Sequence, residues 1–156
     1  MTPERTLKLR AEDADDLAVI SACVQDALVS VTDLTYDRAE RRFTLVANRF
    51  RWEARPAPAD GALPFERTLC AVSFGEVERA SYRGFRRRAD DRILALLAIR
   101  VGGAAEGGGG PGIVDLEFAG DAAVRLTVSA IRVHATDIGE PWPTAWRPEH
   151  GADETR

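Results

Sequence analysis

The chain has 156 residues and a net charge of −4, and 45% of its residues are apolar while 29% are charged. This length fits a single domain that can bury roughly 70% of its unfolded surface, so neither a disulfide nor a metal is needed to hold a core. The acidic balance argues against strong nonspecific attraction to nucleic acid or to an anionic membrane. We therefore expect one domain over residues 1–140 and a tail over residues 141–156.

The cysteines and the first residues bear on the cellular compartment. Cys23 and Cys70 are the two cysteines, and both fall on apolar faces, as buried free thiols do in a reducing compartment. No apolar run follows residues 1–5, which predicts that there is no secretory signal. The longest apolar run, residues 93–99, is too short to span a bilayer. We expect a cytoplasmic protein that has no membrane partner.

Residues 11–28 show the clearest helical pattern of the chain. Leu17, Ile20 and Val24 recur three or four residues apart, which places them on one face of a helix. Asp13 or Asp16 can accept hydrogen bonds from the first turn as the amino-terminal cap. The segment therefore predicts one amphipathic helix that packs on a sheet.

The next two segments alternate with the period of two that is typical of strands. Residues 29–36 and 42–53 predict a hairpin whose four-residue loop pairs Leu34 with Phe43. In the second strand the apolar positions change from odd to even numbers. Such a change indicates either a bulge or a strand buried on both faces, and we place a bulge near residues 47–49.

The middle of the chain alternates between loops and strands. Residues 54–66 are rich in alanine, proline and glycine and predict a loop. Strands are predicted over residues 70–74, 77–85 and 93–101, and the last is apolar enough to lie in the centre of a sheet. Residues 102–112 are mostly glycine and predict a flexible loop, because they lack the helix start and the Gly-Lys-Ser/Thr sequence of phosphate-binding loops.

Residues 113–133 predict a second hairpin. A three-residue loop at its centre directs the alternating apolar side chains of both strands to the same side of the hairpin, and it pairs Leu116 with Val124. The same register sets Asp115 opposite Arg125 on the outer face, where opposite charges stabilise a pair by about 0.2–1 kcal/mol. The favourable charge pair supports this register.

The end of the chain combines tryptophans with prolines. Residues 131–138 fit a helical turn that Gly139 would end. Beyond it, Trp142 and Trp146 lie among three prolines, which lack a backbone donor and disfavour both a helix and a central strand. Tryptophan has a large apolar ring, so two tryptophans are unexpected in a tail that is free in solvent. We therefore expect residues 139–150 to fold back over the domain or to bind a partner.

Together these segments predict an α+β fold. An antiparallel sheet of about six or seven strands, curved by bulges, carries the helix of residues 11–28 packed on it. A split barrel of the pleckstrin-homology kind is one form that such a sheet can take.

Several segments resemble a bacterial family of uncharacterised proteins, a domain of unknown function: residues 12–28, 41–53, 94–100 and 142–150. The most specific parts are Asn48-Arg49-Phe50-Arg51-Trp52-Glu53 and the ending Arg147-Pro148-x-His150. The resemblance spans nearly the whole chain and implies an intact single domain. It implies no particular mechanism.

The arginine-rich strand end at residues 48–53 is one candidate recognition face. If Phe50 and Trp52 point inward, Arg49 and Arg51 line an outer stripe, where forked guanidinium groups suit the carboxylates of an acidic partner. The alternative is the ordinary charged outer face of an antiparallel sheet.

A second candidate is the run Tyr82-Arg83-Gly84-Phe85-Arg86-Arg87-Arg88, in which aromatic residues alternate with arginines. Bases can stack on the aromatic rings while Arg86 and Arg87 contact the phosphates of RNA or another polyanion. Two aspartates follow almost directly, so a solvated turn with local ion pairs explains the run equally well.

His134 and Asp137 are three residues apart, and together with His150 they offer ligands for a metal or groups for catalysis. No motif with metal-binding spacing occurs. Cys23 and Cys70 lie on core-facing patterns, where a thiol is usually inert. We therefore predict no catalytic residue, no metal site and no cofactor.

The sequence favours a non-enzymatic binding or adaptor module that uses the arginine-rich sheet face or the tryptophan tail. Its candidate binding residues are Arg49, Arg51, Trp52, Arg86, Arg87, Trp142, Trp146 and His150. A protein is the leading partner, and RNA or another polyanion is the second. The alternative function is a small enzyme with a site formed by His134, Asp137 and His150 beneath the tail.

Overall fold

The computed structural model describes residues 6–54, 65–86, 91–103 and 112–148. These residues form one α-helix, one 3₁₀ helix and ten strands. The helices are α1 (Ala14–Cys23) and η1 (Val31–Asp33). The strands are β1 (Lys8–Ala11), β2 (Ala27–Ser30), β3 (Thr35–Asp37), β4 (Arg42–Phe50), β5 (Phe65–Phe74), β6 (Val77–Arg83), β7 (Ile93–Gly103), β8 (Gly112–Phe118), β9 (Ala122–Val128) and β10 (Val133–Thr144).

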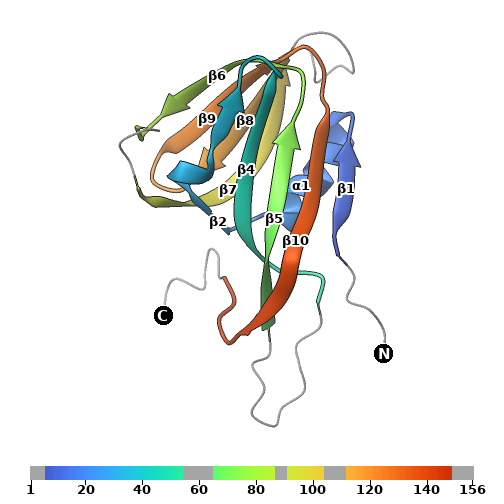
Figure 1. Cartoon of the computed structure of the whole chain (residues 1–156), viewed down its shortest axis with the longest axis vertical. Coiled ribbons are helices and arrows are strands. Elements are labelled where there is room, and N and C mark those ends of the chain that lie inside the picture. The colour runs from blue at the N-terminus through green and yellow to red at the C-terminus, as the bar shows by residue number, and fades with distance from the viewer. Residues whose placement is uncertain (1–5, 55–64, 87–90, 104–111, 149–156) are drawn as a thin grey trace.

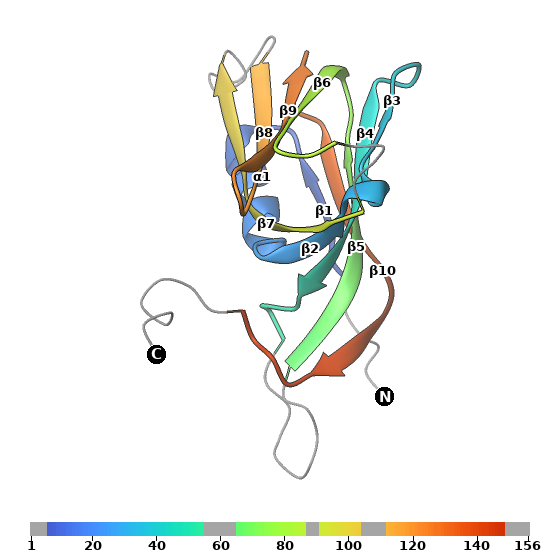
Figure 2. The same ribbon diagram turned by 90° about the vertical axis from the view of Figure 1, so that its left-hand side faces the viewer.

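The strands form one antiparallel sheet in the order β1-β10-β5-β4-β2-β7-β8-β9-β6, and β3 pairs with β4 beside this path. The sheet bends back on itself, so that β10, β5 and β4 form a first layer and β7, β8, β9 and β6 form a second layer (Figures 1 and 2). β2 joins the two layers, because it pairs with both β4 and β7. α1 contacts β1 and β7. In the part of the chain that the structure describes, no helix is long and apolar enough to cross a membrane.

The core lies between the two layers. Successive side chains of a strand point to opposite faces, so every second residue of each layer points inward. Val72 and Phe74 of the first layer and Leu116 and Val124 of the second are buried in one continuous cluster. The remaining residues of each strand form two outer faces, one for each layer.

The predicted fold class is wrong in its number of strands and in the length of its helix. We expected six or seven strands, whereas the described residues form ten, and the sheet is a bent double layer in place of the split barrel. The helix ends at Cys23 because Asp26 adopts a left-handed conformation with φ of 65°, and Ala27 then begins β2. β1 was not predicted at all.

The two predicted hairpins have different outcomes. β8 and β9 pair Leu116 with Val124 and Asp115 with Arg125, which confirms the predicted register. The register of the first hairpin is wrong, because Phe43 pairs with Tyr36 and not with Leu34. The 3₁₀ helix η1 interrupts the first strand just before this point, which alternation by itself does not reveal.

The predicted bulge in β4 is absent. β4 and β5 keep an unbroken register from the Phe43–Phe74 pair to the Phe50–Arg67 pair. Arg49 and Phe50 are both buried, although neighbouring residues of a strand point to opposite faces. The change of phase therefore marks a strand end that is buried on both faces.

The predicted helical turn at residues 131–138 is also wrong, because β10 occupies this segment and continues into the tail. After a register shift that follows Ile138, Trp142 to Thr144 pair with β5. The described pairs of β1 with β10 reach only Thr136, so β5 is the one strand paired with β10 at Trp142. Proline is tolerated on such an edge, since no donor is needed there.

The two predicted loops are described only in part. Phe65 and Glu66, which we assigned to a loop, belong to β5. The glycine-rich segment contributes residues 102–103 to β7 and Gly112 to β8. The rest of both loops lies outside the described residues.

Candidate functional site

The predicted outer stripe of Arg49 and Arg51 is not exposed on the surface. Arg49 is 0% exposed and Arg51 only 7% exposed, while Trp52 is half-buried. Arg49 alternates with the inward-facing Leu45 and Ala47, so its side chain enters the space between the layers. We expected Arg49 on the outer face of the strand, and it points to the inner face instead.

Arg49 is the centre of a buried ionic cluster. Its Nε and Nη2 donate to the two carboxylate oxygens of Asp137, each at 2.8 Å. Its Nη1 and Nη2 donate to Glu53 at 3.0 and 2.7 Å, and Nη1 also donates to the Phe50 carbonyl at 3.3 Å. Asp137 in turn accepts a hydrogen bond from the Leu7 backbone at 3.0 Å. All five N–H groups of the guanidinium thus have acceptors.

This cluster sets the charge states of its neighbours. Burial alone would raise the pKa of Asp137, but hydrogen bonds from Arg49 and from the Leu7 backbone hold that pKa below its ordinary value. Partial burial of the Glu53 side chain would raise its pKa, but hydrogen bonds from Arg49 hold that pKa below its ordinary value. Burial raises the pKa of the Cys70 thiol to about 12 and also raises the pKa of Cys23. Both thiols are therefore protonated at neutral pH and poor nucleophiles.

The apolar patterns predicted that both cysteines are buried and unpaired, and the two differ in burial. Both thiols are free, and Cys70 is buried while Cys23 is half-buried. The thiols are poor nucleophiles and the hydrogen bonds of Arg49 are complete. The ionic cluster is therefore structural, and it joins β4, β10 and Leu7, the residue before β1.

The tail returns to the domain through the pairing of Trp142 to Thr144 with β5 and through residues 147 and 148. The Arg147 guanidinium lies 5.7 Å from the centre of the Trp52 ring, and Pro148 is buried. Trp52 also donates from Nε1 to the Gln25 carbonyl at 3.2 Å. Trp146 is 63% exposed, so the folding back of the tail does not bury this side chain.

The remaining predicted residues are not brought together. His134 is exposed and Asp137 is buried, because residues three apart in a strand point to opposite faces. His150 and Arg87 lie outside the described residues, and Arg86 is exposed. Within the described ranges, no three His, Cys, Asp or Glu side chains are grouped to hold a metal ion.

The aromatic residues of the arginine-rich run face the core. The rings of Tyr82 and Phe85 contact each other with their centres 5.7 Å apart, and both pack against the buried cluster. These rings are therefore not presented together with the arginines for the stacking of bases.

The outer face of the first layer carries an exposed apolar row that sequence reasoning missed. Leu28, Asn48, Leu69 and Ile138 are successive register partners on β2, β4, β5 and β10. Leu28 is 36% exposed, Leu69 37% and Ile138 40%. Neighbouring strands lie about 4.8 Å apart, so the row spans roughly 15 Å.

Trp142 extends this row. It pairs with Arg67, two residues along β5 from Leu69, so its side chain lies on the same face. It is 37% exposed. We call Leu28, Leu69, Ile138 and Trp142 the apolar face.

One signal for the apolar face was present in the sequence. Leu69 is out of phase with Cys70 and Val72, so alternation places it outward. Leu28 and Ile138 gave no such signal, because both were assigned to helical segments that the structure replaces with strands.

These features define an antiparallel β protein with a buried ionic cluster and an exposed apolar face. A family model described as "Protein of unknown function (DUF2948)" matches residues 7–150. The chain belongs to this family, which confirms the expected resemblance to a domain of unknown function. No curated protein and no solved structure matches the chain.

Proposed function

We propose that this protein is a non-enzymatic binding module that holds a protein partner on the apolar face. One observation carries the proposal: Leu28, Leu69, Ile138 and Trp142 are all more than a third exposed on one outer face. Leu69, Ile138 and Trp142 lie on the neighbouring strands β5 and β10, and Leu28 lies on β2 beyond Asn48 of β4. Exposed apolar side chains that gather on one face of a folded protein mark interaction sites. Tryptophan is enriched among the residues that dominate binding energy, so Trp142 is the expected anchor.

The rim of the apolar face favours a partner with acidic residues. Lys8 pairs with Thr136, which lies two residues before Ile138 on the same outer face. Arg10 pairs with His134 further along this face. Both basic side chains are exposed, Arg10 in a 3.7 Å ion pair with Glu12, and complementary charges around an apolar centre fix the orientation of a partner. We place this module in the bacterial cytoplasm, in keeping with its free thiols.

The test compares tagged full-length proteins recovered from the native host, with the bound proteins identified by mass spectrometry. Leu69→Glu places a charge in the centre of the apolar face. Leu97→Glu is the matched control, because Leu97 is 43% exposed on β7 of the second layer. Thermal unfolding first establishes that both variants are folded.

The expected result is a protein that is recovered with wild type and Leu97→Glu and is depleted about tenfold or more with Leu69→Glu. Equal recovery of the same proteins with all three chains would contradict the proposal. So would the absence of any protein that distinguishes wild type from Leu69→Glu.

A further inference from the structure

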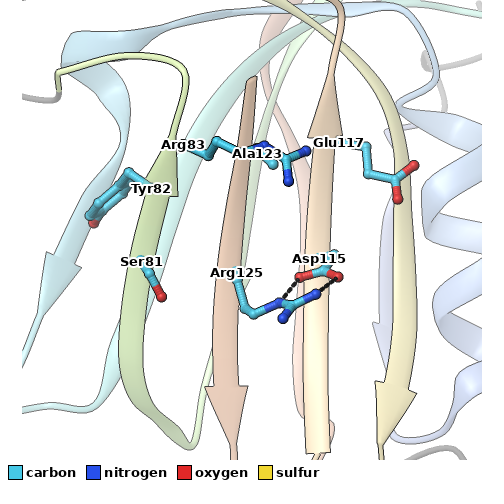
Figure 3. A pocket seen from close by; sticks show the side chains of 7 residues that line it. All are labelled: Ser81, Tyr82, Arg83, Asp115, Glu117, Ala123 and Arg125. Atoms are coloured by element: carbon cyan, nitrogen blue, oxygen red, sulfur yellow. Dashed lines mark hydrogen bonds and ion pairs between the residues drawn. The ribbon is translucent and has the colours of Figure 1, made fainter. Parts of the chain in front are cut away.

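A hollow of about 350 Å³ lies on the outer face of the second layer, opposite in the fold to the apolar face (Figure 3). It extends over β6, β9 and β8, and it plays no part in the proposed function above. The residues that line it are Ser81, Tyr82, Arg83, Asp115, Glu117, Ala123 and Arg125. The Tyr82 ring lies on the side of β6 opposite to the side chains of Ser81 and Arg83 (Figure 3).

The hollow has a simple origin in the register of these strands. Arg83 pairs with Ala123, which pairs with Glu117, so a methyl group lies between two long side chains. In the neighbouring row on this face, Ser81 pairs with Arg125. Two small side chains are thereby surrounded by longer ones, and space is left above the sheet.

The carboxylates at the hollow are already engaged. Asp115 accepts two hydrogen bonds from Arg125, from Nε and Nη2, each at 2.9 Å. Glu117 accepts from Nε of Arg100 on β7 at 2.8 Å. Figure 3 shows the Glu117 carboxylate directed away from the other labelled side chains. Their negative charges are therefore compensated by the arginines beside them.

Among the described residues that line the hollow, Arg83 is the arginine without a carboxylate partner. It donates from Nε to the Asp121 carbonyl at 3.4 Å, and no carboxylate among the described residues forms an ion pair with it. Its guanidinium extends across β9 over Ala123, in the same direction as that of Arg125 (Figure 3). The two arginines lie two residues apart along the strands, a separation of roughly 7 Å.

We propose that this hollow binds the phosphoryl group of a small phosphomonoester between Arg83 and Arg125. The two terminal nitrogens of Arg83 and Nη1 of Arg125 are not used in the Asp121 and Asp115 contacts, and the Ser81 hydroxyl lies in the same row as Arg125. Guanidinium groups bind phosphate oxygens through paired, charge-assisted hydrogen bonds. A tetrahedral group with three free oxygens can use donors on two sides of the hollow at once.

The test is a titration of the isotope-labelled full chain with inorganic phosphate, followed by amide chemical shifts, with sodium chloride as the control for ionic strength. Arg83→Gln removes the charge that has no carboxylate partner among the described residues. Arg132→Gln is the control, since Arg132 is an exposed arginine paired with Glu76 away from the hollow. A second series uses phenyl phosphate, which carries the same group on an organic body.

We expect saturable shifts for residues 81–83 and 123–125 with both phosphate compounds. Arg83→Gln should weaken the affinity by about tenfold or more, as the loss of hydrogen bonds to a charged group implies, while Arg132→Gln leaves it unchanged. Shifts that chloride reproduces, or that persist in Arg83→Gln, would overturn the proposal. Because the apolar face shares no residue with the hollow, this test can fail while the proposed protein-binding function stands, and the reverse also holds.

Discussion

Arg49 is the largest fully buried side chain among the described residues, and it is charged. Removing an arginine from water costs several kcal/mol, which only complete hydrogen bonding and opposite charge can offset. Asp137, Glu53 and the Phe50 carbonyl supply both. Asp137 also accepts from Leu7, so one buried carboxylate holds two distant segments of chain together.

Substitution of Arg49 tests this arrangement. Arg49→Met leaves the Asp137 carboxylate buried without its partner, and it should lower the free energy of unfolding by about 3–5 kcal/mol. Arg100→Met removes an arginine with an equally short 2.8 Å bond to Glu117, but that pair is exposed to solvent and the change should be small. Urea denaturation of both variants measures the difference. Similar losses for the two variants would show that burial does not decide the contribution of Arg49.

The lowered pKa of Asp137 predicts a dependence of stability on pH. A carboxyl group whose pKa is lower in the folded state contributes stability above its unfolded pKa, near 4, and this contribution is lost as the pH falls through the folded pKa. The free energy of unfolding of the wild type should therefore decline from about pH 5 downward. Asp137→Asn should be less stable at neutral pH and should decline less steeply, as urea denaturation at several pH values would measure. Parallel pH profiles for the two proteins would contradict the assignment to Asp137.

At the scale of elements, β4 and β10 each combine two environments along one strand. β4 ends with inward and outward side chains that are both buried, at Arg49 and Phe50. β10 begins between β1 and β5 and, beyond its register shift, pairs only with β5 among the described strands. A prediction from alternation assumes that a strand has the same buried and exposed faces along its whole length, and neither β4 nor β10 does.

Truncation after Gly139 tests the contribution of the end of β10. It removes the pairs of residues 142–144 with β5 and the contact of Arg147 with Trp52. We expect a lower melting temperature and a loss of about 1–3 kcal/mol. Trp146→Ser in the full chain should melt like the wild type, because this side chain is mostly exposed. If the truncated chain melts unchanged, the end of β10 does not contribute to the stability of the fold.

For the whole molecule, the bend of the sheet decides what each face can do. One long sheet that folds onto itself buries its inner face and leaves two outer faces. The face of the first layer is apolar at its centre, whereas that of the second layer carries paired charges and the hollow beside Arg83. Two chemically different surfaces therefore occur on a chain of 156 residues.

By itself, the sequence determined the local features. It predicted the register of β8 and β9, because alternation and the Asp115–Arg125 pair agree, and it placed Cys70 in the core. It also indicated the family to which the chain belongs.

Only the tertiary structure decided which strand ends are covered on both faces and which apolar side chains stay exposed. Arg49 is buried because Asp137, 88 residues away in the chain, meets it across the sheet. Leu28 and Ile138 are exposed because their segments are strands and not helices, with both residues in one outer row. Such outcomes depend on contacts between distant segments, and the local periodicity of a sequence carries no information about them.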